Sequence, residues 1–217
     1  MKSRGILMSG EMVRAWLNGW KGQTRRTRGL DQVNENPDAW TFEGYVMGKA
    51  LFHRTGTAET VSVRPPYGFV GDQLYFKETW KMFEREDDGK DFLHFRADDA
   101  KVDPVWWTED DWRAPNPKWC TNTVFKHWQS SMLMPKMCAR IHVPITGVRV
   151  ERLQDITVQD AKAEGIHTHE RYSPMDFQVI KEYRKLWDLL NAKRGHSWTH
   201  NDWVWVYEFE KNKTVKA

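Results

Sequence analysis

The sequence predicts an α+β protein, because segments with the spacing of amphipathic helices alternate with short segments in which every second residue is apolar. Helices are expected over residues 9–18, 157–165 and 173–195, and strands over residues 73–79, 139–150 and 203–209. A chain of 217 residues with 40% hydrophobic residues and 13 tryptophans has enough apolar side chains for a buried core. We expect a single domain over residues 1–217 that carries two insertions.

Neither a membrane segment nor an exported protein is expected. No run approaches the ~18 apolar residues of a membrane span, and residues 1–8 contain no signal-peptide core. These observations predict a cytoplasmic protein. The net charge of +3 is too small to predict nucleic-acid binding by itself, although basic residues gather at 25–28 while residues 84–111 are rich in Asp and Glu.

The two cysteines, Cys120 and Cys138, form no disulfide framework and favour a reducing compartment. Together with His127 and His142 they make a conceivable zinc set, but their spacing matches no common zinc site. We therefore expect no metal and no other cofactor.

The first helix is predicted by Ser9, a favoured N-cap residue, followed by apolar residues at helical spacing. Gly19 suits the left-handed position that ends a helix. Among the later helices, Thr157 and Asp160 form a capping box for a short helix that stops at Gly165. The last helix is expected to turn five apolar residues toward the core, which are Phe177, Ile180, Leu186, Trp187 and Leu190.

In the strand over residues 73–79, alternation places Glu78 on the same face as Leu74, Phe76 and Trp80. If these apolar residues point inward, Glu78 does too, and a buried carboxylate needs a cationic or hydrogen-bonding partner. Lys21 or one of the arginines is the expected partner. The alternative is that the strand end frays and leaves Glu78 in water. The final strand places Trp203, Trp205, Tyr207 and Phe209 on one face.

Two stretches look inserted. Residues 29–64 predict a hairpin or a pair of short strands around Arg54-Thr55-Gly56-Thr57. Residues 81–129 are acidic, rich in tryptophan and without clear periodicity, so we expect a mobile surface excursion. Within it, Trp106, Trp107 and Trp112 are candidates for closing over a ligand or contacting a protein.

The segment 19–26, which follows the first helix, is the strongest candidate for a site. It places an amine, a hydroxyl and two guanidinium groups close together, from Lys21, Thr24, Arg25 and Arg26. The alternative is that these basic residues only complement the helix dipole. Glu164 lies in the last turn of its helix, where its charge opposes the dipole. Such a conflict is expected at a functional position, and it also occurs by chance on a surface.

The order of these motifs resembles the ASCH family, a branch of the PUA-like fold. The shared features are Gly-x-Lys-x-x-Thr-x-Arg at 19–26, Pro-x-Gly-x-x-Gly-Asp at 66–72 and Ala-x-x-Glu-Gly at 161–165. More narrowly, the chain resembles uncharacterised ASCH-like proteins of bacteriophages and prophages, through Met-Pro-Lys at 134–136 and Trp-Val-Trp-Val at 203–206. The resemblance runs from about Gly5 to Phe209. It implies a β-barrel of mixed or antiparallel strands with flanking helices.

The resemblance also implies a chemistry. Small ASCH proteins act as amidohydrolases on acetylated cytidine, and their motif residues fall on Lys21, Thr24 and Glu164 of this chain. Thr24 would attack the amide carbonyl, Lys21 would take its proton if burial and the neighbouring arginines lowered its pKa, and Glu164 would orient the amine or activate water. This chain departs from those enzymes at Trp20 and Gly22, which leaves the substrate open.

Two other functions remain open. Other PUA-like domains bind RNA or modified bases without hydrolysis. In that case Arg25, Arg26, Glu78 and Trp80 would form the binding cleft for RNA, DNA or a free nucleoside. A third hypothesis is an interaction protein that blocks a host factor through residues 81–129.

Overall fold

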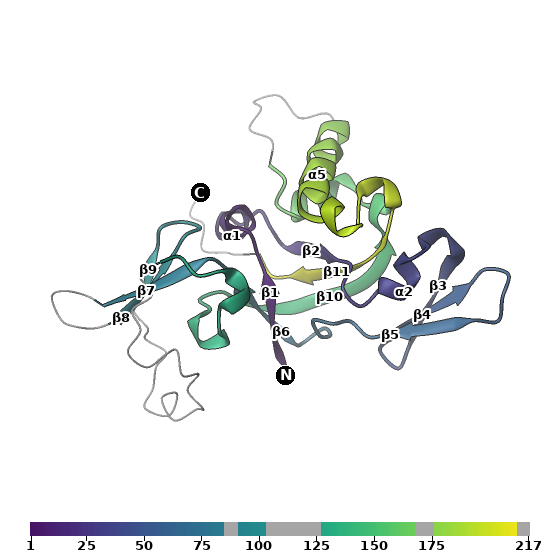
Figure 1. Cartoon of the computed structure of the whole chain (residues 1–217), viewed down its shortest axis with the longest axis horizontal. Coiled ribbons are helices and arrows are strands. Elements are labelled where there is room, and N and C mark those ends of the chain that lie inside the picture. The colour runs from purple at the N-terminus through teal and green to yellow at the C-terminus, as the bar shows by residue number, and fades with distance from the viewer. Residues whose placement is uncertain (85–90, 103–126, 168–175, 212–217) are drawn as a thin grey trace. The chain divides into compact units, whose positions relative to one another are not determined.

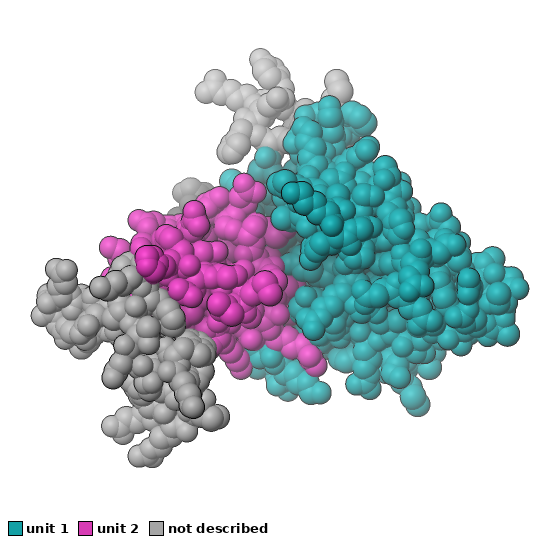
Figure 2. All heavy atoms as spheres, viewed as in Figure 1, with its two compact units in different colours: residues 1–3, 15–73, 143–217 teal, residues 4–14, 74–142 magenta. Residues whose placement is uncertain are grey.

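The computed structural model describes residues 1–84, 91–102, 127–167 and 176–211. These residues fall into two compact units, shown in different colours in Figure 2. Unit 1 consists of residues 1–3, 15–73 and 143–217, and unit 2 consists of residues 4–14 and 74–142. The α+β class is confirmed, since strands dominate and a few helices accompany them (Figure 1).

In unit 1, β11 (Trp203–Phe209) lies between β10 (His142–Arg152) and β2 (Gln23–Arg26), and both pairings are antiparallel. Two helices, α4 (Val158–Ala163) and α5 (Asp176–Asn191), pack on one face of these strands (Figure 1). Val204 and Val206 of β11 belong to the apolar cluster under these helices. Trp205 and Tyr207 are also fully buried, so both faces of β11 are covered, beyond the single face predicted.

The apolar face predicted for α5 is wrong in part. The buried residues are Val179, Tyr183 and Trp187, at helical spacing, whereas Phe177 is 76% exposed and Leu190 39% exposed. The face that α5 buries therefore differs from the face predicted from hydrophobicity alone. A tyrosine occupies the centre of its buried face because the ring is apolar enough to bury.

The predicted ends of the first two helices are confirmed, whereas the predicted start of the last helix at residue 173 lies outside the described residues. In α1 (Gly10–Leu17), Ser9 Oγ accepts a hydrogen bond from the Met12 amide at 3.3 Å, and Gly19 adopts φ 72°. In α4, Thr157 and Asp160 form the expected capping box, and Gly165 adopts φ 99°. Left-handed backbone at both glycines lets the chain turn sharply at the end of each helix.

The insertion at residues 29–64 contains more structure than a hairpin. After α2 (Asp31–Asn34), an antiparallel sheet forms from β3 (Trp40–Val46), β4 (Lys49–Arg54) and β5 (Thr60–Val63). Phe52 of β4 is fully buried, and its ring lies 5.3 Å from that of Trp203. This aromatic contact ties the insertion to β11 within unit 1.

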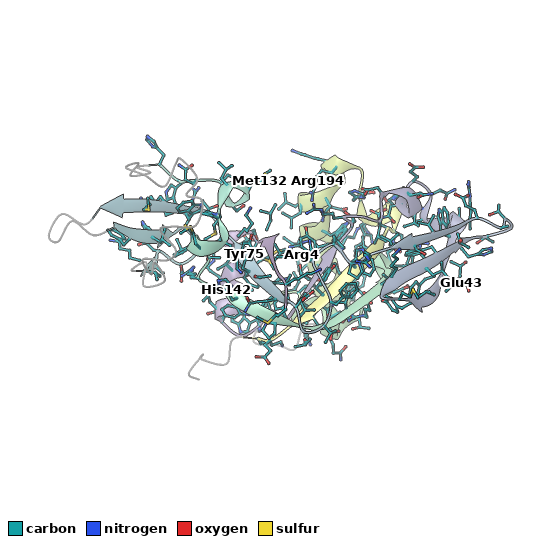
Figure 3. All side chains as sticks on the ribbon, turned by 90° about the horizontal axis from the view of Figure 1, so that it is seen from below. Arg4, Glu43, Tyr75, Met132, His142 and Arg194 are labelled. Carbon is teal, nitrogen blue, oxygen red and sulfur yellow. The ribbon has the colours of Figure 1, made fainter. Side chains whose placement is uncertain are left out.

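Unit 2 contains most of β1 (Ser3–Leu7) and of β6 (Gln73–Lys77), which are adjacent strands. It also contains an antiparallel meander of β7 (Trp80–Glu84), β8 (Asp91–Phe95) and β9 (Lys101–Val102). The ring of Tyr75 in β6 lies 6.1 Å from that of His142, the first residue of β10 (Figure 3). The meander occupies part of the stretch 81–129, for which no regular structure was predicted. Trp106, Trp107, Trp112 and Cys120 lie outside the described residues, so their predicted roles stay predictions.

The predicted barrel does not appear, because none of the sheets formed by the described strands closes on itself. In the described part of the chain, no helix combines the length and apolar character that crossing a membrane requires.

Candidate functional site

Lys21 is fixed where the end of α1 meets the end of α4. After the turn at Gly19, the Lys21 amide donates to the Ala15 carbonyl at 3.1 Å, and the next amide, of Gly22, donates to the Ala163 carbonyl at 2.8 Å. Gly165 sits close to this point, since a Cβ there would lie 2.8 Å from Ala15 Cβ. The two helix ends thus pack backbone against backbone around Lys21.

The side chain of Lys21 is fully buried and bound to Glu164. Its Nζ donates to Glu164 Oε2 at 3.0 Å and to the Glu164 carbonyl at 2.8 Å. Glu164 is itself only 3% exposed. Two residues 143 positions apart in sequence therefore form an ion pair that water does not reach.

Arg25 holds the other oxygen of the Glu164 carboxylate. Its Nη1 donates to Glu164 Oε1 at 3.2 Å, and its Nε donates to Glu151 at 3.0 Å. The guanidinium also lies 3.5 Å from Asp160 and 5.9 Å from the centre of the Tyr183 ring. Arg25 is 2% exposed, so this arginine is a buried bridge between three carboxylates.

A second arginine extends the network toward the surface. Arg149 donates to Glu151 and to Asp160, each at 2.9 Å, and to Glu208. Asp160 therefore caps α4 and binds two arginines, which fixes the helix that presents Glu164. The sequence reasoning missed Glu151 and Arg149. Arg149 and Glu151 are two residues apart in β10 and therefore lie on the same face of the strand. This spacing was the signal in the sequence that could have identified them.

Burial controls the ionisation of this site. Loss of water lowers the pKa of Lys21 from its ordinary value of 10.5, Glu164 opposes the shift, and Arg26 and Arg25 add to it. This is the direction expected from the sequence. Burial likewise raises the pKa of Tyr183 well above its ordinary value. On balance, burial favours the neutral amine of Lys21 more than water does, although Glu164 favours the charged form.

Thr24 is also fully buried, but it is not joined to this ion pair. Its Oγ1 has no hydrogen-bond partner among the residues that the structure describes. Thr24 pairs with Tyr207 in the sheet, whereas Arg25 pairs with Val206, so their side chains leave β2 on opposite faces. The structure brings Lys21 and Glu164 together and leaves the hydroxyl outside hydrogen-bonding distance of both.

Arg26 follows on the same strand and is half-buried. Its Nη1 donates to the Arg25 carbonyl at 2.9 Å.

The remaining predicted residues, Glu78 and Trp80, belong to unit 2. Glu78 is 1% exposed, as the alternation predicted, and its partner is Arg140, which donates to both carboxylate oxygens at 2.9 Å. Burial raises the pKa of Glu78 although Arg140 opposes the shift. Arg140 also binds Asp98 and stacks 4.2 Å from the centre of the Phe95 ring. Trp80 is 2% exposed within the apolar cluster of unit 2, so its ring is core.

The zinc hypothesis gains no support in the described part of the chain, where no group of three or more His, Cys, Asp and Glu residues could hold a metal ion. Cys138 is buried in the apolar cluster of unit 2.

Comparisons with family models, with curated proteins and with solved structures found no match for this chain.

Proposed function

We propose that the chain hydrolyses an amide bond of an acylated, cytidine-type nucleoside, with Lys21 as base, Thr24 as nucleophile and Glu164 as the residue that positions the Lys21 amine. The observation that carries the proposal is the fully buried Lys21 amine, bound to Glu164 and lowered in pKa by loss of water. The identity of the substrate rests on the resemblance to the ASCH family.

Stability alone is a poor explanation for such an ion pair. Removing two charges from water costs several kcal/mol per ion, and replacing buried pairs with apolar residues is often neutral or stabilising. A lysine whose pKa is lowered by burial, by contrast, loses its proton more readily than an ordinary lysine, and only the neutral amine can act as a general base. The Lys21–Glu164 pair is therefore better explained by chemistry than by folding.

The proposed reaction balances as follows. The Thr24 hydroxyl attacks the amide carbonyl carbon and passes its proton to the neutral Lys21 amine. Lys21 then gives this proton to the exocyclic nitrogen of the base as the C–N bond breaks, which leaves an ester on Thr24. Water hydrolyses the ester and releases the carboxylic acid. Lys21 and Thr24 are both fully buried, and Thr24 leaves β2 on the face opposite to Arg25. The mechanism therefore requires β2 and the end of α1 to rearrange when substrate binds, so that the hydroxyl and the amine come within hydrogen-bonding distance.

Binding without hydrolysis, with Trp80 stacking on a base, is not favoured. Stacking needs an accessible ring, and Trp80 is 2% exposed. Arg25 is likewise buried and occupied by carboxylates.

The experiment compares turnover of N4-acetylcytidine by wild type and by Lys21→Met, Thr24→Val and Glu164→Gln, with Lys185→Met on the exposed part of α5 as control. We expect each site variant to lose most turnover. The fold loss in the Lys21/Thr24 double variant should be far smaller than the product of the fold losses in the two single variants, because the residues act as one unit. Wild type that hydrolyses no acylated nucleoside contradicts the proposal. Full turnover by Thr24→Val contradicts the nucleophile assignment.

A further inference from the structure

The three-stranded meander of unit 2 has two chemically different faces. Trp80 and Met82 of β7, with Leu93 and Phe95 of β8, are buried in the apolar cluster of the unit. Alternation turns the residues between them to the other side. The pairing confirms this, because Lys81, His94 and Lys101 stand opposite one another across the three strands.

Aromatic rings and cations meet on this second face. Trp128 is held beside β7 by backbone hydrogen bonds between Gln129 and Trp80, the shorter at 2.7 Å. Lys81 Nζ lies 4.5 Å and Arg96 Cζ lies 5.9 Å from the centre of the Trp128 ring. Lys101 Nζ lies 5.9 Å from the centre of the Phe92 ring. We call Lys81, Phe92, Arg96, Lys101 and Trp128 the basic aromatic face.

Among the residues that the structure describes, this face carries three cations, from Lys81, Arg96 and Lys101, and the acidic residues of the adjoining turn are paired. Asp98 and Asp99 lie in the turn between β8 and β9, where Asp98 binds Arg140 and Asp99 binds His94. Arg96 and Lys101 are exposed, and Trp128 is 36% exposed. A large aromatic side chain at the surface among cations is more typical of a binding surface than of a core.

We infer that the basic aromatic face binds single-stranded nucleic acid. A base can stack on an aromatic ring while neighbouring Lys and Arg side chains contact the phosphates on either side of it. Single strands fit better than a duplex, because stacking requires an accessible base face. This site lies in unit 2 and uses none of the residues proposed for hydrolysis.

The test measures binding of fluorescently labelled single strands of roughly 12 nucleotides, a length within the usual range for such sites. An abasic strand of the same length and an acidic peptide of the same charge serve as comparison ligands. We expect Trp128→Ala to weaken binding by about 5- to 100-fold, the effect of losing one stacked base, and Trp128→Phe to weaken it less. We expect Arg96→Ala and Lys101→Ala each to reduce the slope of log affinity against log salt by about 0.7. Lys185→Ala is the control of equal charge.

Three results would overturn the inference. One is wild type that binds no single strand at low salt. Another is equal affinity for the abasic strand or the acidic peptide, which would show general attraction to negative charge. The third is a loss with Lys185→Ala as large as that with Arg96→Ala. If Trp128→Ala fails to fold, as judged by circular dichroism, Trp128→Phe and the two cation variants still decide the question.

Discussion

Replacing Glu164 by Gln isolates the cost of keeping the Lys21 amine out of water. Glutamine keeps the shape of the side chain but removes the charge that accepts from Lys21 at 3.0 Å and from Arg25 at 3.2 Å. Breaking a buried pair in this way typically costs about 3–5 kcal/mol of unfolding free energy. Lys21 can escape part of this cost by losing its proton.

In the Glu164→Gln variant, Lys21 can lose its proton, and the free energy of this loss is the most that Lys21 can contribute to the destabilisation. At pH 7, a lysine with an ordinary pKa of 10.5 loses its proton at a cost of about 5 kcal/mol, from about 1.4 kcal/mol per pH unit. At pH 9 the limit is about 2 kcal/mol. The destabilisation by Glu164→Gln should therefore shrink as the pH rises, and urea unfolding at both pH values measures it. Tyr183 does not lose its proton between pH 7 and pH 9, because its pKa is raised well above the ordinary value of 10.0.

The Lys21→Met, Glu164→Gln double variant is the matched control. It removes the uncompensated cation, so it should be more stable than Glu164→Gln alone at pH 7 and lose the pH dependence between pH 7 and 9. Two results would refute this explanation: a loss of unfolding free energy below about 1 kcal/mol for Glu164→Gln at pH 7, or a loss that does not change with pH. A buried charge that loses its partner destabilises the folded state by more than that.

Three further predictions concern single positions. Thr24→Val should leave stability unchanged or raise it by about 1 kcal/mol, because it replaces a buried hydroxyl that has no described partner; a loss above ~1 kcal/mol in urea unfolding would show a hidden hydrogen bond. Glu78 has a raised pKa, so the folded state binds its proton more tightly, and stability should fall as the pH rises from the ordinary value of 4.5 through the raised value. Glu78→Gln should abolish this fall, and an unchanged pH profile would contradict it. Gly165→Ala should cost about 1–3 kcal/mol, since φ is 99° and the new Cβ meets Ala15 at 2.8 Å; a thermal midpoint equal to wild type would contradict it.

The parts of the fold that follow local rules could be predicted from the sequence. Ser9, Gly19 and the Thr157–Asp160 box end or begin helices through contacts within a few residues, and the structure shows each of them. The prediction of the buried face of α5 failed in part, because packing against β11 favoured Val179 and Tyr183 over the more apolar Phe177. Tertiary contacts decide such a choice, and they are not visible in the spacing.

The meander of unit 2 was missed for a different reason. Averaged over residues 81–129, the composition is acidic and without a period. Within β8 and the residue after it, however, the polar residues His94 and Arg96 alternate with the buried apolar residues Leu93 and Phe95. A short strand has too few residues to stand out in a long window.

The candidate site was predictable only in its parts. Local patterns drew attention to Lys21 and Glu164 separately, and only the family resemblance combined them into one site. No local rule joins residues 143 positions apart. The alternation along residues 73–79 predicted that Glu78 is buried but not that Arg140, 62 positions away, is its partner. Pairings of this kind depend on the topology, which a single sequence does not fix.

The pH dependence of kcat/KM for N4-acetylcytidine tests the central claim most directly. If Lys21 is the base, the rate should rise with pH along a limb whose midpoint lies below the ordinary lysine value of 10.5, because burial lowers this pKa and only the neutral amine accepts a proton. A wild-type protein with no turnover at any pH, or a rate that is flat across the range in which Lys21 loses its proton, would contradict the account.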